Sequence, residues 1–209
     1  MPPLTGLYIV ADLHGPVGEK IHAIQREFDP KLARFLTPHI TIAGSSGMGP
    51  IRPDVPVAEL RARLEPVAAS IAPMTLRFER PMRFMQTTVV VLPLSPNGPL
   101  RALHEAIKAS GLPYAQPRFA FSPHATLSLY RELTPATERK LLAVRIDDPV
   151  VIDRFTVTET KDPNPPRTVL ELMLRGGSGA GAGGVPAGGT GGGSARTRAS
   201  GDGGPPPTA

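Results

Sequence analysis

Two short segments of the sequence place histidine in the same chemical setting. Residues 37–44 read TPHITIAG and residues 122–129 read SPHATLSL, so His39 and His124 each follow a proline and precede a threonine by two positions. An imidazole with an ordinary pKa of roughly 6.5 accepts a proton when neutral and donates one when charged. Two imidazoles that face each other would supply the acid and the base of one reaction, so the pair predicts general acid–base catalysis.

Each motif is expected to form a β-strand, because apolar residues alternate with the histidine and the threonine. Residues two apart on a strand point to the same face, so His39 shares a face with Thr41, and His124 with Thr126. The preceding prolines lack an amide donor, which is typical of a strand start or edge. The other interpretation is a half-buried strand histidine bonded to neighbouring carbonyls. Recurrence of the whole pattern favours a shared function.

The three remaining histidines lack this setting. His14, His22 and His104 neither follow a proline nor precede a threonine by two positions. His22 and His104 fall in predicted helices, where we expect partly exposed surface positions, and His14 falls in a predicted loop. All three are left outside the predicted site.

The elements around the motifs occur in a repeated order. Apolar runs predict strands, and apolar residues at helical spacing, with Pro at the first turn or Gly at the end, predict helices. Thr134 is the expected N-cap of the last helix. The predicted elements are strand 7–13, helix 16–28, motif strand 37–44, helix 58–72, strands 74–80 and 87–94, helix 99–110, motif strand 122–130, helix 134–144, and strands 150–160 and 167–175. This order indicates a duplicated fold, with one unrepeated α/β domain as the alternative.

Composition limits the class of protein and its compartment. The 209 residues are 40% hydrophobic, which is enough for a buried core, and contain no cysteine, which excludes disulfides, thiolate nucleophiles and cysteine-ligated zinc. The N-terminus lacks a basic signal region, and no stretch approaches the roughly 20 apolar residues of a membrane span. We therefore expect a cytoplasmic protein with no membrane association. A net charge of +5 would attract phosphate-bearing ligands, although no block of consecutive basic residues marks a nucleic-acid arm.

The composition changes abruptly at Gly176. From there to the end the chain is almost entirely Gly, Ala, Ser, Thr and Pro, which cannot bury enough apolar area to offset the entropy of ordering. The sequence thus predicts a domain over residues 1–175 and a disordered tail over 176–209.

The paired motifs resemble the signature of the 2H phosphoesterase superfamily, which includes the bacterial 2′-5′ RNA ligase-like proteins, or RNA 2′,3′-cyclic phosphodiesterases. The segment LYIVADLHGPVGEKI resembles the first strand and helix of those proteins, and the resemblance spans most of residues 5–175. It implies an α+β fold that is duplicated and two-lobed, with antiparallel strands around a central cleft and outer helices. It also implies that His39 and Thr41 face His124 and Thr126 across that cleft.

The sequence departs from the family pattern at two places. The family often has an arginine five residues after the second histidine, where this chain has Leu129, and Arg131 follows two positions later. After the first motif the family often has Phe-Leu-Gly, where this chain has residues 43–46, AGSS. The candidate substrate contacts outside the motifs are Arg131 for phosphate and three aromatic residues for a base or ribose: Tyr8, Phe121 and Tyr130.

The function implied is hydrolysis of the 2′,3′-cyclic phosphate ends of RNA or nucleotides, with His39 and His124 as acid and base in an order the sequence leaves open. Thr41 and Thr126 would donate hydrogen bonds to the non-bridging phosphate oxygens. We expect no metal and no cofactor, because the motifs carry no carboxylate beside the histidines and the chain has no HExxH cluster. We also expect a monomer. The alternatives are 2′-5′ RNA ligase or 2′-5′ phosphodiesterase action on another nucleotide substrate, and a non-catalytic module that binds RNA ends.

Overall fold

The computed structural model describes residues 5–44, 46–84, 86–129, 132–161 and 164–176. The helices are α1 (Gly15–Phe28), α2 (Pro30–Phe35), α3 (Val57–Ser70), α4 (Pro99–Lys108) and α5 (Pro135–Ala143). The strands are β1 (Thr5–Asp12), β2 (His39–Ala43), β3 (Met74–Leu76), β4 (Met82–Arg83), β5 (Val90–Pro93), β6 (His124–Ser128), β7 (Val150–Ile152), β8 (Arg154–Lys161) and β9 (Asn164–Met173). The predicted boundary before the Gly-rich segment stays a prediction, because residues 177–209 lie outside the described residues.

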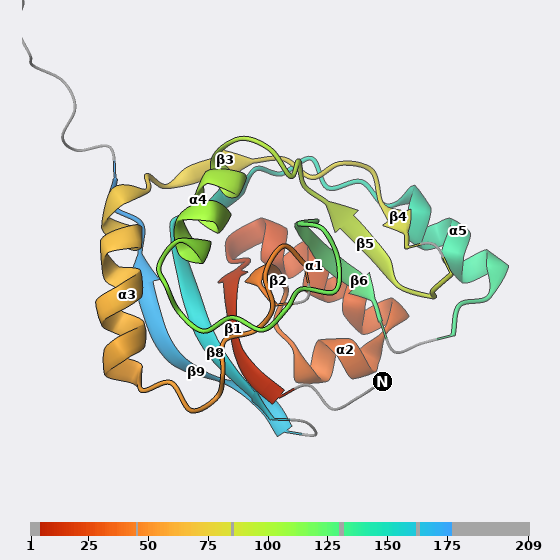
Figure 1. Cartoon of the computed structure of the whole chain (residues 1–209). Coiled ribbons are helices and arrows are strands. Elements are labelled where there is room, and N and C mark those ends of the chain that lie inside the picture. Colours follow the sequence, from red (N-terminus) through yellow and green to blue (C-terminus); the bar gives the residue numbers. More distant parts are fainter. Residues whose placement is uncertain (1–4, 45, 85, 130–131, 162–163, 177–209) are drawn as a thin grey trace, which may run out of the picture. The chain divides into compact units, whose positions relative to one another are not determined.

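A seven-stranded sheet in the order β4-β5-β6-β2-β1-β8-β9 organises the fold, and β3 and β7 form a second sheet of two strands. Every pair of neighbouring strands in both sheets is antiparallel. The fold class is therefore α+β. The two motif strands, β2 and β6, are neighbours at the middle of the large sheet (Figure 1).

The two halves of the large sheet, on either side of the line between β2 and β6, have the same arrangement of strands. On one side β2 pairs with β1, and on the other β6 pairs with β5, each with a register shift at the same place after the threonine. The matching pairs are Val10↔Thr41 and Ile9↔Ala43 on one side, and Val91↔Thr126 and Val90↔Ser128 on the other. The duplication predicted from the order of elements is thus present as a pseudo-two-fold arrangement of strands, down to the bulge.

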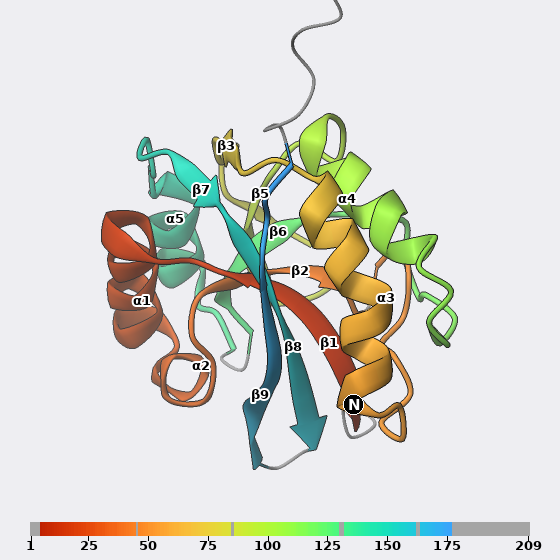
Figure 2. The ribbon, with the colours of Figure 1, turned by 90° about the vertical axis from the view of Figure 1, so that its left-hand side faces the viewer.

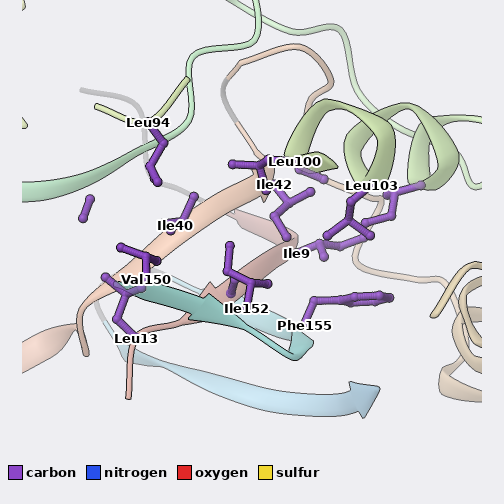
Figure 3. Close-up of a cluster of buried hydrophobic side chains, with 14 of the residues drawn as sticks. Ile9, Leu13, Ile40, Ile42, Leu94, Leu100, Leu103, Val150, Ile152 and Phe155 are labelled. Atoms are coloured by element: carbon purple, nitrogen blue, oxygen red, sulfur yellow. The ribbon is translucent and has the colours of Figure 1, made fainter. Parts of the chain in front are cut away.

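The helices pack on the apolar face of the strands. Helix α1 packs against β6 and α5 against β5, whereas α3 packs against β9 and also contacts α4. Figure 2 shows α1, α2 and α5 apart from α3 and α4. In Figure 3 Ile40 and Ile42 of β2 point into one cluster with Leu100 and Leu103 of α4 and Phe155 of β8. Burial of each such side chain contributes roughly 1.5–3 kcal/mol to the stability of the fold. The apolar face of β2 is therefore held in the core and its polar face lies outside.

Several predicted elements differ from the structure. The strand expected over 150–160 is two strands in different sheets, because β7 pairs with β3 and the chain passes to the large sheet at Asp153. The strand expected over 74–80 is only β3. A separate helix, α2, follows α1, because Asp29 accepts a hydrogen bond from the Leu32 amide at 3.0 Å and Pro30 starts the new turn. The predicted N-cap Thr134 is confirmed, since its side chain accepts from the Thr137 amide.

None of the helices in the described part of the chain has both the length and the apolar character that a membrane-crossing segment requires.

Candidate active site

The register of β2 against β6 brings the two motifs together. Ile40 pairs with Ala125 in antiparallel register, so His39 lies opposite Thr126 and Thr41 lies opposite His124. Ile40 and Ala125 are fully buried, whereas the two histidines and two threonines are half-buried. All four polar side chains therefore share the face away from the core. The histidines are diagonal neighbours, and such residues lie roughly 7–8 Å apart across an antiparallel pair, which leaves room for a phosphate between the rings.

Both imidazoles are held in the same way by the backbone before them. Nδ1 of His39 hydrogen-bonds the Thr37 carbonyl at 2.8 Å, and Nδ1 of His124 hydrogen-bonds the Ser122 carbonyl at 2.7 Å. Because a carbonyl oxygen only accepts, Nδ1 carries the proton in each ring. Nε2 is therefore the nitrogen with which each histidine can exchange a proton with a ligand.

The strand starts that carry these rings are also alike. Pro38 and Pro123 cannot donate, but their carbonyls accept from Leu13 and Leu94 respectively, each at 2.9 Å. These bonds tie each motif to the strand beside it, β1 or β5. The prolines thus sit where a missing amide proton costs nothing, as the sequence predicted.

The two histidines differ in their surroundings. Burial lowers the pKa of His124, and the charge of His39 lowers it further, against the opposing effect of the Ser122 hydrogen bond. Phe84, in the turn after β4, meets the His124 ring edge-on with centroids 5.0 Å apart. His124 therefore favours the neutral form near pH 7. Phe84 was not predicted, because its position depends on a tight turn closed by the Phe84 amide and the Val89 carbonyl at 3.0 Å.

A carboxylate stands next to the other histidine. Asp12 of β1 is the register partner of His39, and its Oδ2 accepts a hydrogen bond from the Thr156 hydroxyl of β8 at 3.0 Å. The corresponding partner of His124 on β5 is Pro93. The two halves of the sheet therefore differ in the residue beside the motif histidine, which is an aspartate on β1 and a proline on β5.

Tyr8 of β1 lies beside Thr41 of β2. A Cβ atom added at Gly44 would lie 2.5 Å from Thr41 Cγ2 and 3.0 Å from Tyr8 Cδ1, so the ring and the threonine fill the space that the glycine leaves. Burial raises the pKa of the Tyr8 phenol, and the charge of Arg118 acts in the opposite direction. The AGSS departure at residues 43–46 therefore has a structural consequence, because its glycine lets an aromatic ring approach a motif threonine.

A buried side chain from each crossover helix braces the opposite motif strand. Gln25 of α1 donates to the Thr126 carbonyl of β6 at 2.8 Å, and His104 Nδ1 of α4 donates to the Ile42 carbonyl of β2 at 2.9 Å. The expectation that His104 is partly exposed is wrong, because it is only 1% exposed. Its place beside Leu100, Leu103 and Ile107, at helical spacing, was the signal for burial.

The family model described as the 2′-5′ RNA ligase superfamily matches residues 13–163. The chain belongs to this superfamily. No curated protein matches it in sequence.

The solved structures that match share the fold at low sequence identity. They include Escherichia coli LigT complexed with 3′-AMP (18% identity, 81% of this chain and 98% of that one, TM-score 0.53). LigT complexed with ATP matches with 19% identity, 81% and 97% coverage and a TM-score of 0.52. TT0787 of Thermus thermophilus matches with 16% identity, 81% and 98% coverage and a TM-score of 0.55. This superfamily, also called the 2H phosphoesterases, is the one that the paired motifs resemble.

The other residues predicted as substrate contacts lie in different places. Tyr8 is half-buried beside Thr41, as described above. Phe121 is 8% exposed, and its ring stacks on His104 with centroids 3.8 Å apart, so it is a core residue of the α4 side. Tyr130 and Arg131 lie outside the described residues, and their predicted roles stay predictions.

No group of three or more His, Cys, Asp or Glu in the described ranges is arranged to hold a metal ion.

Proposed function

We propose that this member of the 2′-5′ RNA ligase superfamily is a metal-independent phosphodiesterase that hydrolyses the 2′,3′-cyclic phosphate ends of RNA or nucleotides. The observation that carries the proposal is the antiparallel register of β2 and β6, in which each motif histidine lies opposite the threonine of the other motif. Such an array offers two proton-transfer groups and two hydroxyl donors to one phosphate.

In the proposed reaction His124 acts as the base. Its lowered pKa keeps it neutral near pH 7, so its Nε2 accepts a proton from the attacking water as oxygen bonds to phosphorus. His39, in its protonated form, donates the Nε2 proton to the departing ribose oxygen as the P–O bond breaks. The products are a phosphomonoester and a free ribose hydroxyl, and proton exchange with solvent restores both rings.

Thr41 and Thr126 donate their hydroxyl protons to the non-bridging oxygens. Charge accumulates on these oxygens in the transition state, so fixed donors stabilise it more than the ground state. The strand holds each hydroxyl two residues from its histidine, which fixes the phosphate between the two rings.

Three further observations support a nucleotide substrate. The related LigT structures were solved in complex with 3′-AMP and with ATP. The net charge of +5 favours the approach of phosphates. Tyr8 presents an aromatic ring next to Thr41, where a base or ribose could contact it.

We further propose that the protein acts in the cytoplasm, as the absence of cysteine favours.

The experiment is turnover of 2′,3′-cyclic AMP and of a cyclic-phosphate-ended oligonucleotide, each with and without EDTA. Hydrolysis that persists in excess EDTA supports the proposal, and loss restored by added divalent metal contradicts it. Incubation with 2′-5′-linked dinucleotides tests the second candidate, 2′-5′ phosphodiesterase or ligase action, which the superfamily's description favours. Binding of RNA ends without turnover on any substrate would instead support the binding module.

A further inference from the structure

An open hollow lies between α4 and the segment that leads from α4 to β6. Its volume is about 470 Å³, and its walls are formed by one face of α4, residues 117–121 and Gly47. Sites for small ligands commonly have roughly 300–1,000 Å³, so the hollow has room for one nucleotide unit.

The walls of the hollow carry an excess of positive charge. Arg101, Lys108 and Arg118 line it together with one acidic residue, Glu105. Arg101 is engaged, because it pairs with Glu105 at 3.3 Å and donates to the Pro96 carbonyl at 2.8 Å. Among the residues that the structure describes, Lys108 and Arg118 have neither an ion-pair nor a hydrogen-bond partner. Two cations are thus available to an anionic ligand.

Aromatic rings form another part of the hollow. Phe119 is 68% exposed, although its backbone is fixed by a hydrogen bond from the Gly47 amide to the Phe119 carbonyl at 2.9 Å. Phe121 lies deeper, stacked on His104. An exposed aromatic ring on a fixed backbone beside free cations is the combination that holds single-stranded nucleic acid, by stacking on a base and by attracting the backbone.

The hollow lies beside the second motif, because residues 117–121 of its wall run directly into Ser122, whose carbonyl holds the His124 ring. Arg118 lines the hollow, and its charge also acts on the phenol of Tyr8, whose ring lies against the Gly44 position beside Thr41. An RNA strand whose terminal phosphate is held by the motifs must extend away from them. The hollow offers such a strand basic side chains and an aromatic ring.

We propose that the hollow holds the nucleotide preceding the terminal one in an RNA strand, with its phosphate between Lys108 and Arg118 and its base on Phe119. This inference rests on the proposed function and makes it more specific: the substrate is an RNA strand rather than a free cyclic nucleotide.

The test compares kcat/KM for a tetraribonucleotide ending in a 2′,3′-cyclic phosphate with kcat/KM for 2′,3′-cyclic AMP. Phe119→Ala should lower the ratio of the two values by about 5- to 20-fold, as expected for a lost base stack. Lys108→Ala with Arg118→Ala should lower it similarly. The double variant should also flatten the dependence of log kcat/KM on log salt concentration for the tetranucleotide by about 0.7 per lost phosphate contact. Lys140→Ala on α5, which packs at β5, removes an exposed charge elsewhere and should leave the ratio unchanged.

An unchanged ratio in both hollow variants, or the same ratio change in Lys140→Ala, would overturn the inference. If the wild type hydrolyses neither compound, the proposed function fails and the hollow is tested separately. Fluorescence anisotropy with a labelled tetraribonucleotide bearing a 3′-phosphate should then show binding that is weakened by Phe119→Ala. Equal binding by wild type and Phe119→Ala, or no binding, would overturn the inference on its own.

Discussion

Replacement of Gly44 by alanine tests how closely the motif threonine must be positioned. The added Cβ would lie 2.5 Å from Thr41 Cγ2, whereas carbon atoms make their best contacts at about 3.5–4.0 Å. Thr41 must therefore shift by about 1 Å or change rotamer. A displacement of about 1 Å at a reacting centre can cost roughly 10²-fold in rate, or about 2.7 kcal/mol of transition-state stabilisation. We expect Gly44→Ala to lower kcat on 2′,3′-cyclic AMP about 10- to 100-fold.

The effect on folding should be smaller. Overpacking costs about 1–3 kcal/mol, and the reduced entropy of the unfolded alanine chain offsets about 0.4–1 kcal/mol of it. The free energy of unfolding, measured by urea denaturation, should thus fall by at most about 2.6 kcal/mol, and the protein should stay folded in the assay.

A second substitution identifies the cause of the loss. Thr41→Ser removes the Cγ2 atom that the new Cβ would meet but keeps the hydroxyl. The variant with both Gly44→Ala and Thr41→Ser should therefore recover most of the activity of Thr41→Ser alone. Wild-type kcat for Gly44→Ala, or no recovery of activity when Thr41→Ser is added, would contradict this role of the Gly44–Thr41 contact.

Three further predictions follow from the surroundings of the site, and a fourth from the composition of the chain. His104→Ala should lower the free energy of unfolding by about 2–4 kcal/mol in urea denaturation, because it opens a cavity and leaves the buried Ile42 carbonyl unpaired; a silent variant would contradict the bracing role. The activity of the wild type should rise with pH through a pKa below 6.5, since the lowered pKa of His124 makes it lose its proton early, and an ascending limb centred above 6.5 would contradict this. Phe84→Ala hydrates that ring, so the limb should move to higher pH, and a shift to lower pH would be inconsistent with burial as the cause. Removal of residues 177–209 should leave the melting temperature and kcat unchanged, and a loss of many degrees would show that this segment is part of the structure.

The buried histidines also make stability depend on pH. Burial lowers the pKa of both His104 and His124 in the folded protein, so between those values and about 6.5 the unfolded chain binds more protons. The contribution of these two histidines to the free energy of unfolding is therefore complete above about pH 6.5. It is lost as the pH falls from there through their lowered pKa values in the folded protein.

Local patterns in the sequence were sufficient to predict the motif strands. The alternation of His39 and Thr41 with buried isoleucines requires a strand with one polar face, and the recurrence at His124 predicts a second. The pairing of these strands with each other could not be predicted from the residues alone, because it depends on where the five other strands of the large sheet and the crossover helices α1 and α4 pack. The resemblance to a known family supplied that step.

Side chains that support the site from a distance in sequence were harder to find. Phe84 reaches His124 only because a turn between β4 and β5 folds it back. Gln25 is polar and was expected on no particular face, yet it is buried against the Thr126 carbonyl. The strand expected over 150–160 looked continuous because its apolar pattern persists across Asp153, and only the competing pairing with β3 divides it.

The most direct test of the two-histidine account is kcat for 2′,3′-cyclic AMP, in excess EDTA, for His39→Ala, His124→Ala and the double variant. The account predicts that each single change lowers kcat by about 10²-fold or more, and that the double change loses less than the product of the two, because the groups act as one unit. Circular dichroism should show that each variant keeps its fold, since both rings are only half-buried. Near-wild-type turnover by either folded single variant would contradict the account.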